Sequence, residues 1–170
     1  KTIIGVVGRY APIKGHFELL KALSVIEDDF ICMLIGRDID NALPLKRFFE
    51  HDKDKNRLMV LGERADIPAL MQLFDFLVLP SLSEGFPNVV AEAMVSGVPC
   101  IVTDVGDAAA IVGETGRVVI PGDSQMLAEA IHQWLNFPPD RLIALGEAAK
   151  ERIVKNYDVN HVASMFRDFI

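Results

Sequence analysis

Short runs of β-branched and other apolar residues alternate along this chain with segments that have helical spacing of apolar residues. The apolar runs lie at residues 2–8, 30–36, 57–62, 75–81, 99–104 and 116–120. Helical segments lie near residues 16–26, 42–51, 67–74, 88–96 and 107–112, and three more helices are expected after residue 124. Because apolar strands joined through helices are typical of parallel sheets covered on both faces, this alternation predicts one doubly wound α/β domain with a six-stranded parallel sheet.

The predicted helix ends carry residues with recognisable roles. Pro87 stands at or near a helix start, and Gly97 follows that helix. Pro68 lies in a first turn after Asp66. Proline near the start and glycine just past the end are the usual helix boundaries. The charged run at residues 51–57 is interpreted as a solvated turn.

Composition restricts the partners of the chain. Its 170 residues are 51% hydrophobic, enough for one domain with a sizeable core. The formal charge of -7 and the pI near 5.0 argue against a general nucleic-acid or membrane surface, so an anionic ligand requires a local basic site. No apolar run approaches the ~20 residues needed to cross a bilayer.

The cysteines and the chain ends suggest where such a domain occurs. Cys32 and Cys100 each fall in a predicted buried strand, which favours a reducing, cytoplasmic setting. The chain begins at Lys1 without a signal-peptide pattern or an initiator methionine, and it stops at Ile170 within a helical pattern. We expect it to be a fragment of a longer protein.

Polar and glycine residues follow several of the predicted strands. In open parallel sheets, ligands bind beyond the carboxyl ends of the strands, where the strand order reverses. The first strand is followed by Gly8, Arg9 and Lys14, and the fourth by a Gly85-Phe86-Pro87 loop that leads into a helix. Backbone N–H groups at such a helix start form an anion site that arginine and lysine can complete, which favours a diphosphate. The alternative is that the loop residues only shape a turn and that the two cations are solvated.

Two glutamates flank this predicted anion site. Glu92 is the only acid in an otherwise apolar helix, one turn beyond Asn88, so we expect it to have hydrogen-bond donors such as the paired hydroxyls of a ribose. Glu84 precedes the anion loop and is positioned for a second hydroxylated ring. The alternatives are an ion pair between Glu92 and a buried arginine, and a turn capped by Glu84. His16 is expected to be exposed or beside a phosphate, and Trp134 to be in the core.

These segments resemble the C-terminal half of a retaining glycosyltransferase of family four, the group 1 type, whose GT-B architecture has two Rossmann-like domains. The resemblance covers essentially the whole chain. It rests on VGRYAPIKGHFELLKAL at residues 7–23, on LGERADIPALMQLFDFLVLPS at residues 61–81, and above all on SEGFPNVVAEAMVSGVPCIVTDVGD at residues 83–107, whose two glutamates are separated by seven residues.

The resemblance implies a nucleotide-sugar donor domain, with a UDP- or GDP-sugar as substrate and an acceptor-binding N-terminal domain absent from residues 1–170. Arg9 and Lys14 match the residues that hold the diphosphate, and Glu84 matches the acid at the donor sugar. These three are the implied catalytic residues. The implied donor-binding residues are Gly8, Arg64, Gly85, Phe86, Pro87, Asn88 and Glu92, of which Glu92 matches the acid on the ribose and Arg64 belongs to the segment lining the base.

The implied reaction is sugar transfer with retention of configuration, without a metal or other cofactor. Asp38 and Asp40 have the spacing of a metal motif from another fold, but they are interpreted as helix-capping residues. Many family members have Gly-Gly, two residues and then Glu after the fifth strand, whereas this chain has Gly106, Asp107 and Ala110.

Three other functions fit parts of the pattern. One is a non-enzymatic nucleotide-sugar binding module, and another is half of a two-domain nucleotide-sugar epimerase. A dehydrogenase domain that binds NAD is disfavoured, because no G-x-G-x-x-G follows the first strand.

Overall fold

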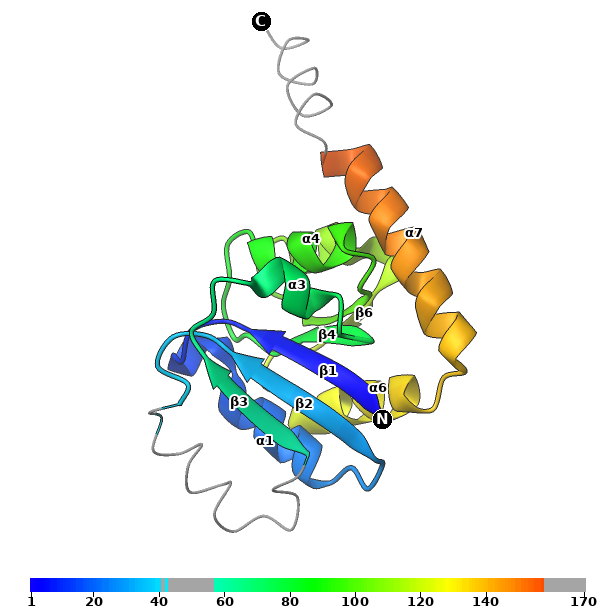
Figure 1. Ribbon diagram of the computed structural model, residues 1–170. Coiled ribbons are helices and arrows are strands. Elements are labelled where there is room, and N and C mark those ends of the chain that lie inside the picture. The colour runs from blue at the N-terminus through cyan, green and yellow to red at the C-terminus, as the bar shows by residue number, and fades with distance from the viewer. Residues whose placement is uncertain (41, 43–56, 158–170) are drawn as a thin grey trace, which may run out of the picture.

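The computed structural model describes residues 1–40, 42 and 57–157 (Figure 1). These residues form a six-stranded sheet in the order β3-β2-β1-β4-β5-β6, and all neighbouring strands are parallel. The strands are β1 (Thr2–Val7), β2 (Phe30–Ile35), β3 (Leu58–Gly62), β4 (Phe76–Leu79), β5 (Cys100–Thr103) and β6 (Arg117–Val119). The sheet predicted from the apolar runs is confirmed.

Helices connect the strands much as the apolar spacing predicts. They are α1 (His16–Ser24), α3 (Ile67–Met71), α4 (Asn88–Val95), α5 (Ala108–Val112), α6 (Ser124–Leu135) and α7 (Pro139–Tyr157), with short 3-10 helices η1 (Pro12–Lys14) and η2 (Gly113–Thr115). The helix predicted at residues 42–51 and the turn predicted at residues 51–57 lie almost wholly outside the described residues. Two of the three helices predicted after residue 124 are described, up to residue 157.

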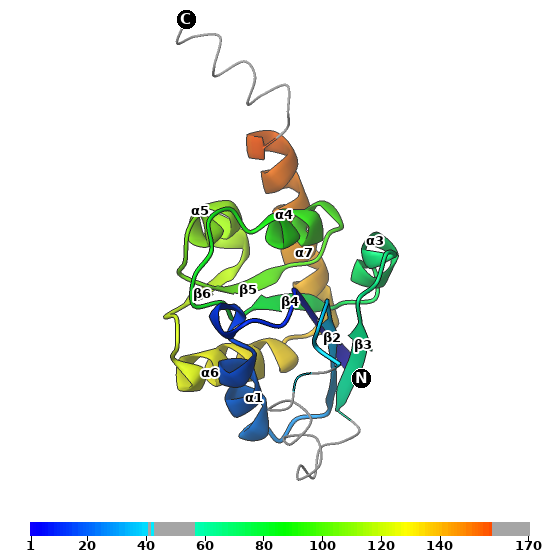
Figure 2. The same cartoon turned by 90° about the vertical axis from the view of Figure 1, so that its left-hand side faces the viewer.

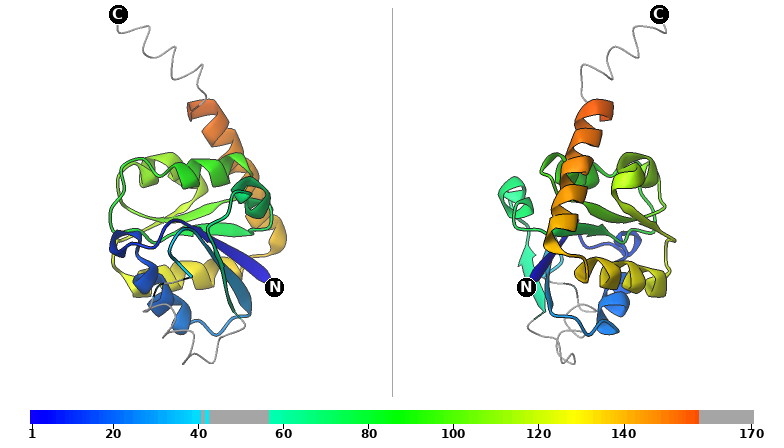
Figure 3. Two further views of the ribbon diagram at one scale, coloured as in Figure 1. Left: turned by 60° about the vertical axis from the view of Figure 1, so that its left-hand side comes forward. Right: turned by 90° about the vertical axis from the view of Figure 1, so that its right-hand side faces the viewer.

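The helices form a layer on each face of the sheet, as Figure 2 shows. One layer contains α3, α4 and α5, and the other contains α1 and α6 (Figure 2). The long helix α7 starts beside α6 and runs along α4 to the first layer, which is clearest in the two views of Figure 3. The described part of the chain is therefore doubly wound, with both faces of the sheet covered.

Each face of the sheet has its own apolar core. Leu19, Leu34 and Ile131 belong to the core on the α1 and α6 side, and Trp134 belongs to it as well, as predicted. Val90, Met94 and Ile111 belong to the core on the α4 side. The strand cysteines are buried and free, and burial raises the pKa of the Cys32 thiol to about 12. None of the helices described in residues 1–157 is long and apolar enough to cross a membrane.

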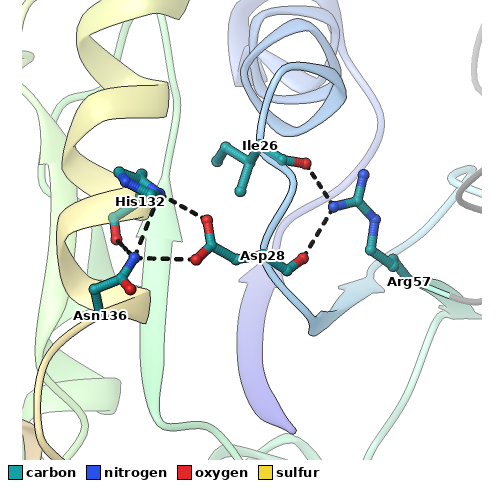
Figure 4. A network of polar contacts seen from close by, with 5 residues as sticks. All are labelled: Ile26, Asp28, Arg57, His132 and Asn136. Carbon is teal, nitrogen blue, oxygen red and sulfur yellow. Dashed lines mark hydrogen bonds and ion pairs between the residues drawn. The ribbon is translucent and has the colours of Figure 1, made fainter.

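A polar network near the amino ends of β2 and β3 joins α6 to the turn before β2 (Figure 4). The Asp28 carboxylate lies 2.6 Å from Nδ1 of His132 and accepts a 3.0 Å hydrogen bond from Asn136. Arg57 donates to the backbone oxygens of Ile26 and Asp28. Although partial burial acts to raise the pKa of Asp28, the bonds from His132 and Asn136 lower it below its ordinary value. The network thus lies at the amino ends of the strands, whereas the candidate site described below lies at their carboxyl ends.

The strand order places a topological switch point between β1 and β4. Strand β1 is followed in the chain by β2 on one side, whereas β4 leads to β5 and β6 on the other. The loops that leave the carboxyl ends of β1 and β4 diverge at this point, and their divergence opens a crevice in folds of this kind. The residues predicted to hold an anion lie in these two loops.

Candidate functional site

The loop after β1 carries the two predicted cations. Gly8 is fixed by a 2.8 Å bond from its N–H to the oxygen of Ile35, and the η1 turn then brings Lys14 back toward the sheet. Arg9 is exposed, and none of the described residues forms an ion pair with it. A Cβ atom on Gly15 would lie 1.8 Å from the oxygen of Pro80, so glycine at this position lets the β1 loop touch the β4 exit.

Lys14 and Glu84 form an ion pair across the switch point. Nζ of Lys14 lies 2.6 Å from Oε1 of Glu84, and Oγ of Ser81 donates to the same oxygen at 2.7 Å. The Glu84 side chain is only 11% exposed, so this carboxylate is largely shielded from water. The partners of the Glu84 carboxylate in this state are Lys14 and Ser81, so the turn cap considered in the sequence analysis does not describe it. The contribution of Ser81 was missed, because a serine at a strand end usually bonds to the backbone.

The loop after β4 ends at Pro87, which is the N-cap residue of α4 as predicted. The N–H of Asn88 donates to the oxygen of Phe86 at 3.0 Å and is therefore not free for a ligand. Within the described residues, the N–H groups of Gly85, Phe86 and Val89 have no hydrogen-bond acceptor. Of these three residues, Phe86 and Val89 line the cavity described below and the predicted Gly85 does not, so the backbone donors beside that cavity are those of Phe86 and Val89. The predicted contribution of Asn88 has to come from its side chain.

Glu92 is exposed, although most other residues of the helix that carries it are apolar. Helix α4 buries Val90, Ala93 and Met94 against the sheet and α7, and it leaves the face that carries Glu92 open. None of the described residues forms an ion pair or a side-chain hydrogen bond with the Glu92 carboxylate. The alternative of a pair with a buried arginine therefore finds no support in the described part of the chain.

One cavity of about 700 Å³ brings most of the predicted residues together. Its walls come from the loops after β1 and β4, from the start of α3 and from α4. The predicted site residues that line it are Gly8, Arg9, Lys14, Glu84, Phe86, Pro87, Asn88 and Glu92. Two cations, two carboxylates and the amino end of a helix thus face one space at the switch point, an arrangement suited to a ligand with both phosphate and hydroxyl groups.

Arg64 lies in a neighbouring hollow rather than in this cavity. That hollow measures about 290 Å³ and is lined by Glu63 and Arg64 together with Gly8 and Arg9, which it shares with the main cavity. Arg64 donates to Asp66 through two bonds of 2.8 and 2.7 Å, and its hydrogen bonds lower the pKa of the Asp66 carboxyl. The structure therefore places Arg64 beside the main cavity, with its guanidinium engaged.

The loop after β5 supports the anion loop through backbone contact. The N–H of Asp107 donates to the oxygen of Gly85 at 3.0 Å. A Cβ on Gly106 would lie 2.0 Å from the same oxygen, and the φ angle of Gly106 is 51°. The Gly106-Asp107 pair, noted in the sequence as a departure from the family pattern, thus fixes the position of the loop that carries Glu84.

His16 is buried, with 3% of its surface exposed, so the option of an exposed side chain is wrong. It lies beside Lys14 at the start of α1, next to the candidate site.

Asp38 and Asp40 are both exposed, and the helix that they were expected to cap falls outside the described residues. Among the described residues, no group of three or more His, Cys, Asp or Glu side chains is arranged to hold a metal ion.

The fold and the cavity define a Rossmann-like α/β domain with a candidate ligand site at its switch point. The profile of the family described as Glycosyl transferases group 1 matches residues 1–136 of the chain. The chain therefore belongs to the group 1 glycosyl transferases.

Similar proteins agree with this assignment. An *Escherichia coli* UDP-Gal:alpha-D-GlcNAc-diphosphoundecaprenol alpha-1,3-galactosyltransferase is 34% identical over 109 residues, covering 61% of this chain and 28% of the relative. The *Anabaena* HepE protein, solved in complex with UDP, has a TM-score of 0.88 and 27% identity, covering 98% of this chain and 48% of that one. The C-terminal domain of the group 1 protein LpcC from *Francisella tularensis* has a TM-score of 0.82 and 25% identity, covering 94% of this chain and 87% of that one. The chain thus spans less than half of the first two proteins.

Proposed function

We propose that this chain is the donor-binding domain of a retaining glycosyltransferase that transfers a sugar from a UDP- or GDP-sugar to an acceptor. The observation that carries the proposal is the shared cavity, in which Arg9, Lys14 and the start of α4 face Glu84 and Glu92. The complexes of the HepE protein with UDP and with UDP-glucose support a nucleotide-sugar ligand. The shorter span of the chain relative to that protein supports an acceptor-binding domain elsewhere in the full-length protein.

In this proposal the diphosphate lies between the two cations and the free N–H groups of Phe86 and Val89. Charge accumulates on the departing diphosphate as the bond to the sugar breaks. Fixed donors directed at such developing charge are worth about 2.7 to 4 kcal/mol each in oxyanion sites. Arg9 and Lys14 supply positive charge at that point, so the proposed mechanism does not require a metal ion.

The two glutamates hold the hydroxylated parts of the donor. Glu92, exposed and without an ionic partner in the described residues, accepts hydrogen bonds from the ribose hydroxyls. Glu84 accepts from hydroxyls of the transferred sugar. In the free domain, Lys14 donates to Oε1 of Glu84. When the donor binds, a phosphate replaces this carboxylate as the partner of Lys14. That exchange frees Glu84 for the sugar.

The proposal is tested by titrating UDP, GDP and pyrophosphate into the ¹⁵N-labelled chain. We expect UDP or GDP to shift the backbone amides of residues 8–15 and 84–92. Pyrophosphate is expected to shift residues 8–15 and 84–89 and to leave Glu92 largely unchanged. The absence of any shift in these segments with millimolar UDP and GDP would refute the assigned site.

Two measurements on the full-length protein test the reaction. The anomeric configuration of the product, read by NMR from the coupling constant of its anomeric proton, is expected to match that of the donor. Transfer is expected to continue at an unchanged rate in excess EDTA. Inversion at the anomeric carbon would disprove retention, and loss of transfer that is restored by a divalent cation would disprove the metal-free mechanism.

A further inference from the structure

His16 is a buried histidine whose polar atoms have no protein partner. It is the first residue of α1, and 3% of the residue is exposed. The centroid of its ring lies 5.6 Å from that of Tyr10, in the loop after β1. In the described part of the chain, neither Nδ1 nor Nε2 has a hydrogen-bond partner. Leaving a buried polar group unsatisfied is destabilising, so native proteins rarely bury two in one side chain. This exception requires an explanation.

A small cavity adjoins the imidazole ring. His16, Lys14, Ser81 and Gly8 line it together with apolar residues from β1 and β4, and its volume is about 10 Å³. That volume is close to what one water molecule needs in a polar cavity. Val7, Gly8 and Lys14 also line the main cavity, so the small cavity forms part of the floor of the candidate donor site.

The ring is in the right state to bind a water molecule. Burial and the positive charge of Lys14 lower the pKa of His16 to about 4, so the imidazole is neutral at pH 7. A neutral imidazole has one N–H donor and one nitrogen acceptor. Water matches both, since it donates and accepts, and buried waters typically make about three hydrogen bonds to polar groups that are otherwise unsatisfied.

The other polar groups of the small cavity belong to the ion pair at the switch point. Oγ of Ser81 and Nζ of Lys14 both bond to Oε1 of Glu84. A water held by His16 therefore lies next to the two residues that hold Glu84.

We propose that the small cavity is a site for one ordered water molecule, and that His16, through this water, is a positioning residue for Lys14 in diphosphate binding. The water completes the hydrogen bonds of the ring. It also keeps the Lys14 ammonium group within reach of both Glu84 and an incoming phosphate. The effect on ligand binding rests on the proposed function, whereas the water site itself does not.

NMR of the free 170-residue chain tests the water site. We expect cross-relaxation between a long-lived water and the His16 ring protons, and ring nitrogen shifts of a single neutral tautomer. Absence of a long-lived water at His16 would overturn the proposal. This measurement uses no ligand, so it remains decisive even if the chain binds no nucleotide.

Calorimetric titration with pyrophosphate and UDP tests the positioning role. His16→Leu removes both polar atoms at similar volume, and we expect it to weaken pyrophosphate binding about tenfold. His16→Asn retains one donor and one acceptor, and is expected to restore most of that loss. His132→Gln, an exposed site on α6, serves as the matched control and should bind as the native chain does.

The outcomes separate this inference from the proposed function. If the native chain binds neither UDP nor GDP, the proposed function fails, and the NMR measurement alone decides on the water site. If the native chain binds and His16→Leu binds equally well with a higher melting temperature, His16 is a packing residue and the inference is wrong. Thermal melts of each variant identify any loss of binding that comes from unfolding.

Discussion

Lys14 and Glu84 form a 2.6 Å ion pair that joins the loop after β1 to the loop after β4. The pair bridges the switch point of the sheet, so the cation proposed to bind the diphosphate is held by the acid proposed to bind the sugar. The free domain thus keeps both side chains beside the cavity before any ligand arrives.

The first prediction concerns competition for Lys14. In Glu84→Gln, the amide oxygen can still accept from Lys14 and Ser81, but the negative charge that competes with phosphate is gone. We expect free pyrophosphate to bind about tenfold more tightly, close to the value of one charge-assisted hydrogen bond, as measured by calorimetry. Glu147→Gln, at an exposed position on α7, is the control and should leave affinity unchanged. Weaker binding to Glu84→Gln would mean that the ion pair assists phosphate binding instead of competing with it.

The second prediction separates ribose from phosphate. Glu92→Ala should weaken UDP or GDP by roughly 1.5 to 3 kcal/mol, the range for hydrogen bonds to a charged group, while free pyrophosphate keeps its affinity. Both dissociation constants can be measured by calorimetry, with Glu147→Ala as the control. Equal weakening of the nucleotide and of pyrophosphate would show that Glu92 does not act on the ribose.

The third prediction compares two glycines with positive φ angles. Gly106→Ala places a Cβ 2.0 Å from the oxygen of Gly85, whereas Gly97→Ala meets no atom within 4 Å. We expect each substitution to cost about 1 to 2 kcal/mol of stability for its left-handed backbone, as measured by urea unfolding. Only Gly106→Ala should also displace the anion loop and weaken UDP or GDP binding, by about tenfold. Equal nucleotide affinity of the two variants would contradict the support that we assign to Gly106.

The fourth prediction is a pH dependence of stability due to His16. Its pKa is lowered from 6.5 to about 4 in the folded chain. Between these two values the unfolded state binds the proton and the folded state does not, so stability is retained above pH 6.5 and lost as the pH falls toward 4. The loss attributable to this residue is on the order of 3 kcal/mol.

Urea unfolding at several pH values between 7 and 4 measures this dependence. His16→Leu should lose less stability over the same interval than the native chain, because it has no imidazole to titrate. Asp28, whose pKa is lowered in the folded chain, also loses part of its stabilising contribution as the pH approaches 4, but it is present in both proteins and cancels in the comparison. Parallel stability profiles for the native chain and His16→Leu would show that His16 is not the responsible group.

Much of the fold could be predicted because short stretches of the sequence specify the individual strands and helix ends. Apolar runs locate the strands, and Pro87 and Gly97 bound α4 through the backbone angles that they favour. The switch point follows from a parallel sheet with helices on both faces. For the same reason, the position of Arg9 and Lys14 opposite the β4 loop could be inferred without coordinates.

The environment of individual side chains could not be predicted in the same way. Glu92 is open to solvent because α7, which begins only at Pro139, covers a different face of α4. The burial of His16 depends on the contact of Gly15 with Pro80, between residues that are distant in sequence. Such tertiary contacts produce no periodic pattern in the sequence around the residues whose exposure they determine.

The backbone contacts of Gly15 with Pro80 and of Gly106 with Gly85 have a consequence for redesign. The loops after β1, β4 and β5 touch through backbone atoms at these contacts, so lengthening one of them displaces its neighbour. They are not separable modules for engineering. A library aimed at a different nucleotide-sugar donor should therefore keep loop lengths fixed and vary exposed residues such as Glu63 and Ala110.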